Sequence, residues 1–441
     1  MSIREDRHGL REWRDGWPLV LASAMGIGIG TYYLASVGVV MKPLQQAFGW
    51  TRGEITAVAA INTTMLVVGS PLLGHLVDRF GPRRLVLPGV IAHCLAFAAV
   101  GFTGPSIWSW YAAWTVSGMC GLVTSSTSWT AAVASRFEKH RGLALGATLA
   151  GHGLTAAVIP ALSVLALMHF GWRGVYFTLA AFGLAAAFPL SYLFFFEGKR
   201  VGEQRRGAQA FVAPDTAGYG LGQAMRQLRY WKIGLALCIG AGAAGAFQLH
   251  LVPMLTDAGI PLSRAAAYMA LLGPTTIAGR LIGGYLMDRI FAPLVAAVVF
   301  GLPLINCFLI PHLGHSAALV PVVVGVVGLS AGVEIDTIAV LASRYFGLRS
   351  YGRVYAPLTA MFSLGFGYAA SLGGVIYDRF GNYDVLLQIL AACLVVSVLL
   401  LLTLGPYPDF ARDPAKRSAR NEAAPSTGAS GDLATADSTD G

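Results

Sequence analysis

An arginine lies deep inside an apolar segment of this 441-residue chain. Arg280 stands eight residues before Asp288, where the segment ends, which is roughly 12 Å along a helix. An ionised guanidinium at that depth in a bilayer costs several kcal/mol unless it is paired, and its planar fork fits a carboxylate bidentately. Asp336 and Glu334 lie at a similar depth in a later segment. Arg280 therefore predicts a carboxylate-binding site or a permanent ion pair, and the two can coexist.

Other polar side chains in the apolar segments are candidates for the same chemistry. His152 and His250 are predicted to contact substrate or proton because histidine titrates near neutrality; a hydrogen-bonded core histidine is the alternative for each. Asp257 is a third candidate proton carrier, or a helix-end residue. Tyr32 and Tyr383 are expected to line a cavity, and core packing is their alternative.

The composition indicates that these residues belong to a membrane protein. Hydrophobic residues make up 55% of the chain and charged residues only 12%, whereas a soluble domain needs about 25% charged residues. Apolar runs long enough to cross a bilayer leave no block for a soluble domain. We expect an all-α membrane protein of twelve transmembrane helices, at about 18–41, 54–77, 85–103, 108–135, 142–168, 172–196, 231–255, 263–287, 292–310, 317–343, 351–377 and 383–404.

The net charge of +9 reflects topology and not a nucleic-acid partner, because the basic residues are spread over short loops. With both termini in the cytoplasm, the inner segments hold 25 Lys and Arg residues and the outer segments five, a bias that fixes the orientation. We expect a monomeric, multi-pass protein of a bacterial inner membrane, in contact with the lipid bilayer. The five outer residues are Lys42, Arg52, Arg173, Arg264 and Arg379.

Short strings recur at offsets of about 208 to 214 residues, which indicates a duplication. GHLVDR matches GGYLMDR, and ASRF matches ASRYF. Two parallel six-helix repeats of this kind place a substrate site near the midplane, between halves that rock against each other. The expected parts are a cytoplasmic N-tail (1–17), an N-terminal half (18–196), a cytoplasmic linker (197–230), a C-terminal half (231–404) and a disordered cytoplasmic tail (405–441).

The loop after the second predicted helix reads GHLVDRFGPRR and resembles the signature of the major facilitator superfamily. Its first glycine allows close helix approach, its aspartate can face a helix N-terminus across the halves, and its arginines hold the loop at the cytoplasmic face. A third similar string, from Gly374 to Gly381, falls on the outer side, and a cytoplasmic Asp378 would contradict the topology. The expected conformational motif comprises Gly74, Asp78, Arg79, Gly81, Arg83, Arg84, Asp288 and Arg289.

Within that superfamily the chain resembles the bacterial branch of the monocarboxylate transporter family, a cousin of the oxalate:formate antiporter. The resemblance rests on Lys42, the string FGWTRGEI (48–55), the embedded Arg280 and the run GVEIDTIAVLASRYFG (332–347). It implies that Lys42 and Arg280 handle the substrate carboxylate and its proton. Mammalian-type relatives have an aspartate where this chain has Thr276, so the proton carrier lies elsewhere or coupling is absent.

These observations predict a secondary transporter of small organic monocarboxylates, either lactate- or pyruvate-like or aromatic, that works by alternating access with a proton. The anion would bind Arg280 and Lys42, and the proton would be carried by Asp336, Glu334 or a histidine. The related oxalate:formate antiporter has a lysine in helix 11 as a second cation for its dianion; the corresponding segment here, 354–374, has no basic residue, which favours one carboxylate over two. A proton-coupled drug or metabolite exporter and a dicarboxylate- or formate-type exchanger are the alternatives.

No enzyme, cofactor or metal site is predicted. Gly240, Gly242 and Gly245 form a GxGxxG string, but it lies inside an apolar helix with no strand before it, so it does not indicate a dinucleotide site. The five cysteines show no metal-binding spacing.

Overall fold

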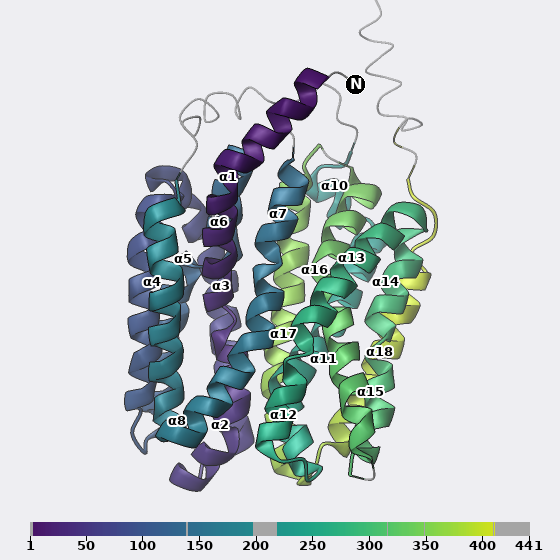
Figure 1. Cartoon of the computed structure of the whole chain (residues 1–441). Coiled ribbons are helices and arrows are strands. Elements are labelled where there is room, and N and C mark those ends of the chain that lie inside the picture. The colour runs from purple at the N-terminus through teal and green to yellow at the C-terminus, as the bar shows by residue number, and fades with distance from the viewer. Residues whose placement is uncertain are drawn as a thin grey trace, which may run out of the picture.

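The structure is a computed structural model that describes residues 3–137, 140–196, 218–314, 316–347, 349–408 and 410. It is a bundle of long helices (Figure 1). The helices are α1 (Ile3–Ile29), α2 (Tyr32–Phe48), α3 (Arg52–Phe80), α4 (Pro82–Ala99), α5 (Ile107–Val123), α6 (Ser126–Arg136), α7 (Arg141–Leu149), α8 (Gly151–Phe194), α10 (Leu221–Met225), α11 (Leu228–Asp257), α12 (Leu262–Met269), α13 (Leu272–Arg289), α14 (Ala292–Gly301), α15 (Leu304–Leu309), α16 (Val320–Phe346), α17 (Tyr351–Phe380) and α18 (Asp384–Leu402).

Ten helical stretches in the described residues are long and apolar enough to cross a membrane. One of them, Leu143–Phe194, has 52 residues and contains two crossings, because the backbone turns at Gly171. A further crossing is made by α5 and α6, which are separated by a break at Thr124 and Ser125. The prediction of an all-α membrane protein with twelve crossings is therefore confirmed.

The turn inside α8 depends on glycine. Gly171 has φ 68° and ψ −175°, a region that is essentially restricted to glycine and costs other residues about 1–3 kcal/mol. We expect Gly171→Ala to lower the melting temperature of the purified protein by several degrees. Gly146→Ala is the matched control, because Gly146 has no left-handed φ and no atom within 4 Å of its Cβ position; equal melting temperatures for the two variants would contradict the role of Gly171.

The break between α5 and α6 lies within the fourth crossing and is held by side chains of the N-terminal half. His93 Nδ1 lies 2.8 Å from the hydroxyl of Thr124, and Trp129 Nε1 donates to the Thr124 carbonyl at 3.0 Å. The hydroxyls of Ser125 and Ser128 are buried and find no hydrogen-bond partner among the described residues. The break thus places unpaired hydroxyl groups inside the membrane part of the protein.

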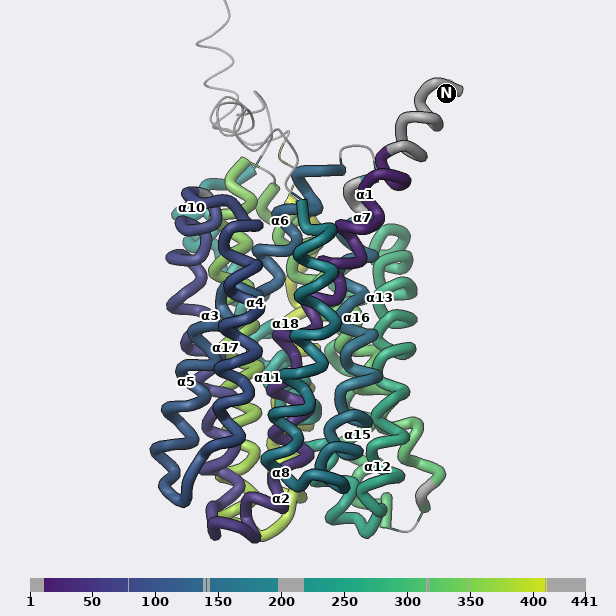
Figure 2. The backbone as a smooth tube through the Cα atoms, turned by 60° about the vertical axis from the view of Figure 1, so that its left-hand side comes forward, coloured from purple at the N-terminus to yellow at the C-terminus, as the bar shows by residue number. Residues whose placement is uncertain are grey.

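The two ends of the bundle are distinguished by the chain termini and by the basic residues that lie there. In Figures 1 and 2, α2 and α12 reach the end opposite the N-terminus, which we call the distal end. The last residues of α18 lie at the same end as the N-terminus (Figure 1). Helix bounds place all five basic residues expected on the outer side at or near the distal end, and Asp378 lies near the distal end of α17, as the predicted topology requires.

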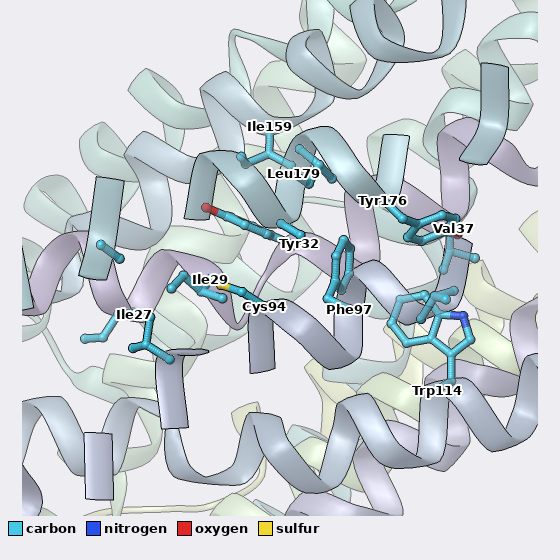
Figure 3. Packing of buried hydrophobic residues seen from close by; sticks show 14 of the residues in the cluster. Ile27, Ile29, Tyr32, Val37, Cys94, Phe97, Trp114, Ile159, Tyr176 and Leu179 are labelled. Carbon is cyan, nitrogen blue, oxygen red and sulfur yellow. The ribbon is translucent and has the colours of Figure 1, made fainter. Parts of the chain in front are cut away.

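The N-terminal half has its own apolar core, shown in Figure 3. Tyr32 is 4% exposed and packs edge-on against Phe97, with their ring centroids 6.1 Å apart, close to Cys94 and Leu179 (Figure 3). Tyr32 thus lies in the packed interior of this half, which was the alternative to lining a cavity.

The predicted linker and tail fall largely on residues 197–217 and 411–441, which lie outside the described residues. The packed structure nevertheless continues past 405, where the tail was expected to begin. The hydroxyl of Tyr407 accepts a hydrogen bond from Ala292 N at 2.9 Å, and its ring lies 5.2 Å from that of Tyr345. An aromatic side chain with a polar end anchors this segment to the C-terminal half.

Candidate functional site

Arg280 pairs with Asp336 between α13 and α16. Its Nε donates to Asp336 Oδ2 at 3.1 Å and to the carbonyl oxygen of Gly332 at 3.3 Å. The helices approach closely here, because a Cβ on Gly332 would lie 2.8 Å from the backbone nitrogen of Arg280. Both bonds use Nε alone, so the terminal Nη1 and Nη2 groups make no hydrogen bond to any described residue. They remain free for the bidentate contact that a carboxylate makes.

His152 of the N-terminal half lies across from Arg280. The next residue, Gly153, packs against Ile277 of α13, one helical turn before Arg280, so His152 lies near Arg280. His152 Nε2 lies 3.3 Å from the hydroxyl of Ser126, at the start of α6. The central cluster, defined as Arg280, Asp336, His152 and Ser126, therefore draws on both halves.

Glu334 does not join the central cluster. It is 3% exposed, and its Oε1 accepts a hydrogen bond from Ser330 Oγ at 2.7 Å. Ser330 Oγ also lies 3.2 Å from the carbonyl oxygen of Val299 on α14. Successive helix residues are rotated by about 100°, so Glu334 points away from the face on which Gly332 and Asp336 meet Arg280.

A second cluster closes the distal end, and Arg52 is its centre. Arg52 is 3% exposed. Its Nη1 donates to Asp257 Oδ2 at 2.7 Å and its Nη2 to Asp257 Oδ1 at 3.1 Å. Lys42 Nζ lies 2.9 Å from the same Oδ1. One carboxylate of the C-terminal half is thus held by two cations of the N-terminal half.

Asp378 adds a contact between the halves at the same place. Its Oδ1 accepts from Arg52 N at 2.9 Å and its Oδ2 from Gly53 N at 2.6 Å. These are the first backbone N–H groups of α3, and the next, that of Glu54, is capped by the Thr51 hydroxyl. A carboxylate from α17 therefore caps α3 of the other half, which a helix N-terminus favours.

Tyr383 and His250 extend the distal cluster into the C-terminal half. The Tyr383 hydroxyl accepts from Arg52 Nη1 at 2.8 Å and lies 3.0 Å from His250 Nδ1. Because His250 Nε2 lies 2.9 Å from the carbonyl of Ala370, which only accepts, Nε2 carries the hydrogen and Nδ1 accepts from Tyr383. Burial raises the pKa of the Tyr383 hydroxyl, so it remains a neutral donor in the turn before α18. Both ring nitrogens of His250 are engaged.

The structure thus separates residues that the sequence assigned to one site. Lys42 lies six residues before the end of α2 and Arg280 lies 18 residues past the start of α12, which places them roughly 9 and 27 Å from the distal end. Lys42, Asp257, His250 and Tyr383 belong to the distal cluster, whereas Arg280, Asp336 and His152 belong to the central one.

Sequence reasoning missed two members of the distal cluster. Arg52 was counted only among the basic residues of the outer side. Asp378 was considered only as part of the string Gly374–Gly381, which resembles the cytoplasmic loop signature but falls on the outer side. The sequence does contain a feature that could have drawn attention to Arg52. Arg52 follows Thr51 of a Thr51–Glu54 capping box and is the first residue of α3, a position where a cation interacts unfavourably with the helix dipole.

The expected conformational motif lies at the end opposite the distal cluster, around the α3–α4 turn. Gly81 forms that turn with φ 82°, and Arg83 Nη2 donates to the Tyr192 carbonyl at 3.1 Å. No atom lies within 4 Å of a Cβ placed on Gly74, so the close approach expected there is not made in this conformation. The side chain of Asp78 lies outside the described part.

The second copy of the motif is at the end of α13. Asp288 lies 4.0 Å from Arg344 Nη2, and the Asp288 side chain is 83% exposed. Arg289 stacks over the ring of Tyr285 at 4.3 Å. By the helix bounds, Arg79 and Arg84 lie at the same end of the bundle.

Comparison with known proteins places this arrangement in a family. Residues 18–370, most of the chain, match the model of the Major Facilitator Superfamily. The chain belongs to the major facilitator superfamily. It is accordingly a membrane transporter of that superfamily and not an enzyme. Two solved structures of a bacterial homologue of the human lysosomal transporter Spinster share this superfamily fold. The inward-facing, unoccupied one has a TM-score of 0.63 at 15% identity, covering 88% of this chain and 94% of that one; the occupied one has 0.65 at 16%, covering 87% and 94%.

Curated members of the superfamily show distant similarity to the chain over most of its length. Monocarboxylate transporter 13 of Bos taurus is 25% identical over 413 residues, which cover 91% of this chain and 92% of that protein. Monocarboxylate transporter 11 of Mus musculus is 26% identical over 384 residues, covering 84% and 83%.

Proposed function

We propose that this transporter carries small organic monocarboxylates, lactate- or pyruvate-like or aromatic, and that Arg280 binds the carboxylate. The observation that carries the proposal is the guanidinium of Arg280, whose two terminal amino groups have no partner among the described residues. A carboxylate in contact with them would lie between the halves, close to His152. The distant relatives named monocarboxylate transporters support the same substrate class.

The proton, in this proposal, is carried by Asp336. Asp336 Oδ2 forms an ion pair with Arg280 Nε at 3.1 Å. Protonation of the carboxyl group would weaken this pair, and the positive charge of the guanidinium would then be available to the substrate carboxylate. Glu334 and Asp257 are weaker candidates, because Glu334 lies against α14 and Asp257 is held by two cations. Protonation would thus link proton and anion binding at one arginine.

The position of the contacts between the halves supports alternating access. The hydrogen bonds and ion pairs found between the halves in the described part join residues 42–64 to residue 257 and residues 368–383. If the termini are cytoplasmic, as the basic residues predict, the distal end faces outward across the inner membrane, and this conformation is closed on that side.

The test is uptake by the purified protein in liposomes. Labelled pyruvate, lactate and benzoate should accumulate when the outside is more acidic, whereas succinate, oxalate and a cationic dye should not. Accumulation of the dye when the inside is the more acidic side would favour the exporter, because an antiporter exchanges it for protons, and oxalate–formate exchange would favour the dicarboxylate alternative. Monocarboxylate uptake that is independent of the pH gradient would contradict proton coupling.

A further inference from the structure

The ninth crossing, made by α14 and α15, contains a carbonyl group that its own helix cannot satisfy. The residue four positions after Val299 is Pro303, which has no backbone N–H to donate. The N–H of Leu302 donates to the Val298 carbonyl at 2.9 Å instead. Among the described residues, the donor that reaches the Val299 carbonyl is the hydroxyl of Ser330 on α16, at 3.2 Å. Without it, a backbone acceptor would be unpaired inside the membrane part, which is costly.

The Ser330 hydroxyl cannot serve both of its neighbours. It has one hydrogen, and its Oγ lies 3.2 Å from the Val299 carbonyl and 2.7 Å from Glu334 Oε1. If Glu334 is ionised, both neighbours are acceptors, and one of them has no hydrogen. If Glu334 is protonated, its carboxyl group donates to Ser330 Oγ and Ser330 donates to Val299, so all three groups are paired. The hydrogen count therefore favours a neutral Glu334.

No cation in the described part of the chain compensates a charge on Glu334. The side chain is 3% exposed and forms no ion pair with a described residue. Arg280, the cation at the same depth, is paired with Asp336 on another face of α16. The helix on the near side, α14, contains no ionisable residue. A buried carboxylate without a cation is far more costly than a buried carboxyl group.

We propose that Glu334 is a positioning residue that permanently carries a proton, which it donates to Ser330 so that Ser330 can cap Val299. The hydrogen bond between the two side chains then runs in the opposite direction to that of an ionised Glu334. This relay fixes the break between α14 and α15 against α16. Because these helices all belong to the C-terminal half, rocking of the halves leaves the relay unchanged. α16 thus has two buried acids with different tasks, and Glu334 takes no part in proton transport.

Infrared spectroscopy tests the proton directly, because a carboxyl group and a carboxylate absorb at different frequencies. At neutral pH, the difference spectrum between the unchanged protein and Glu334→Gln should contain the C=O stretching band of a protonated carboxyl group. The same difference for Asp384→Asn is the control and should contain carboxylate bands, because Asp384 is exposed at the start of α18. Carboxylate bands in the Glu334 spectrum would overturn the proposal.

Uptake separates a fixed proton from a transported one. Glutamine keeps an N–H donor for Ser330 but has no proton to exchange. Glu334→Gln should therefore retain at least half of the initial rate of pyruvate uptake and its dependence on the pH gradient. Loss of that dependence, with pyruvate–pyruvate exchange retained, would make Glu334 the proton carrier and overturn the proposal. This readout alone rests on the proposed function; if the protein transports no monocarboxylate, the infrared spectrum still decides.

The link to the ninth crossing is tested at Pro303. Ser330→Ala removes the donor of the Val299 carbonyl and should lower the melting temperature by several degrees. Pro303→Ala returns an N–H at the position that can donate to Val299, so Ser330→Ala should cost at most half as much in that background. Ser163→Ala is the matched control, because Ser163 is equally buried but donates to Ile159 within a continuous stretch of α8; its cost should be the same in both backgrounds.

Equal losses for Ser330→Ala with and without Pro303 would overturn the proposed relay. If Pro303→Ala does not fold, the infrared spectrum of Glu334→Gln still decides whether Glu334 carries the proton.

Discussion

Replacing Arg280 with glutamine is expected to lower the initial rate of monocarboxylate uptake roughly 100-fold, because loss of a buried charge partner costs about 2–5 kcal/mol. Glutamine offers two hydrogens in place of the free Nη1 and Nη2 groups and carries no charge. Arg280→Lys should retain only part of the activity, since a lysine cannot make the bidentate contact. The measurement is uptake of labelled pyruvate into liposomes at equal protein incorporation.

Two further variants distinguish substrate binding from a structural ion pair. If Arg280 only neutralises Asp336, the double variant Arg280→Gln/Asp336→Asn removes both charges and should recover pyruvate–pyruvate exchange, which needs no net proton movement. If Arg280 binds substrate, the double variant stays inactive in exchange as well. Arg264→Gln is the control, because Arg264 is an exposed arginine of the preceding helix α12. Normal uptake by Arg280→Gln would refute the proposed site.

A leucine at position 374 is expected to prevent the distal end from closing. A Cβ on Gly374 would already lie 2.6 Å from the backbone carbonyl of Arg52 and closer still to the hydroxyl of Thr56. The larger side chain must push α17 away from α3 at the level where Asp378 caps that helix. Overpacking of about 1–3 kcal/mol shifts the balance of closed and open forms about 5- to 150-fold, at 1.4 kcal/mol per tenfold. Uptake should fall more than tenfold. Lys42, which pairs with Asp257 when the distal end is closed, should react faster with a water-soluble amine-acylating reagent.

Gly352→Leu is the matched control for that experiment. Gly352 lies on the same helix, α17, and has no atom within 4 Å of its Cβ position, so this variant should transport and react as the unchanged protein does. Slow acylation of Lys42 in Gly374→Leu would show that the α3–α17 contact does not control closure.

The crossings and the central ion pair could be predicted because both depend on position along the chain. Apolar length defined the twelve crossings, and counting residues from a segment boundary put Arg280 and Asp336 at one depth. The choice between Asp336 and Glu334 could not be made by counting, because it depends on how α16 is rotated against α13. Gly332, whose carbonyl also accepts from Arg280, fixes that rotation.

The distal cluster could not be predicted from the sequence because its partners are remote in the chain and lie near helix ends. A basic residue near a helix end ordinarily reaches water, so Lys42 and Arg52 each have an ordinary explanation when considered alone. Packing of α3 against α17, together with packing of α11 against α17 and α2, buries Arg52 and brings it to Asp257. The similarity of Gly374–Gly381 to a loop motif was noticed, but its role at the opposite end required the contact between Asp378 and the start of α3.

The burial of Arg52 also has a consequence for biosynthesis. Arg52 precedes Asp257 by 205 residues, and at about 5–20 residues per second a ribosome needs roughly 10 to 40 s to cover that distance. During this delay the arginine has no carboxylate partner from the C-terminal half. Because it lies at a helix end, its guanidinium can stay in the lipid headgroup region until the partner is made. Arg280 precedes Asp336 by only 56 residues, so the deeper cation waits for the shorter time. The order of synthesis thus matches the depth at which each charge is buried.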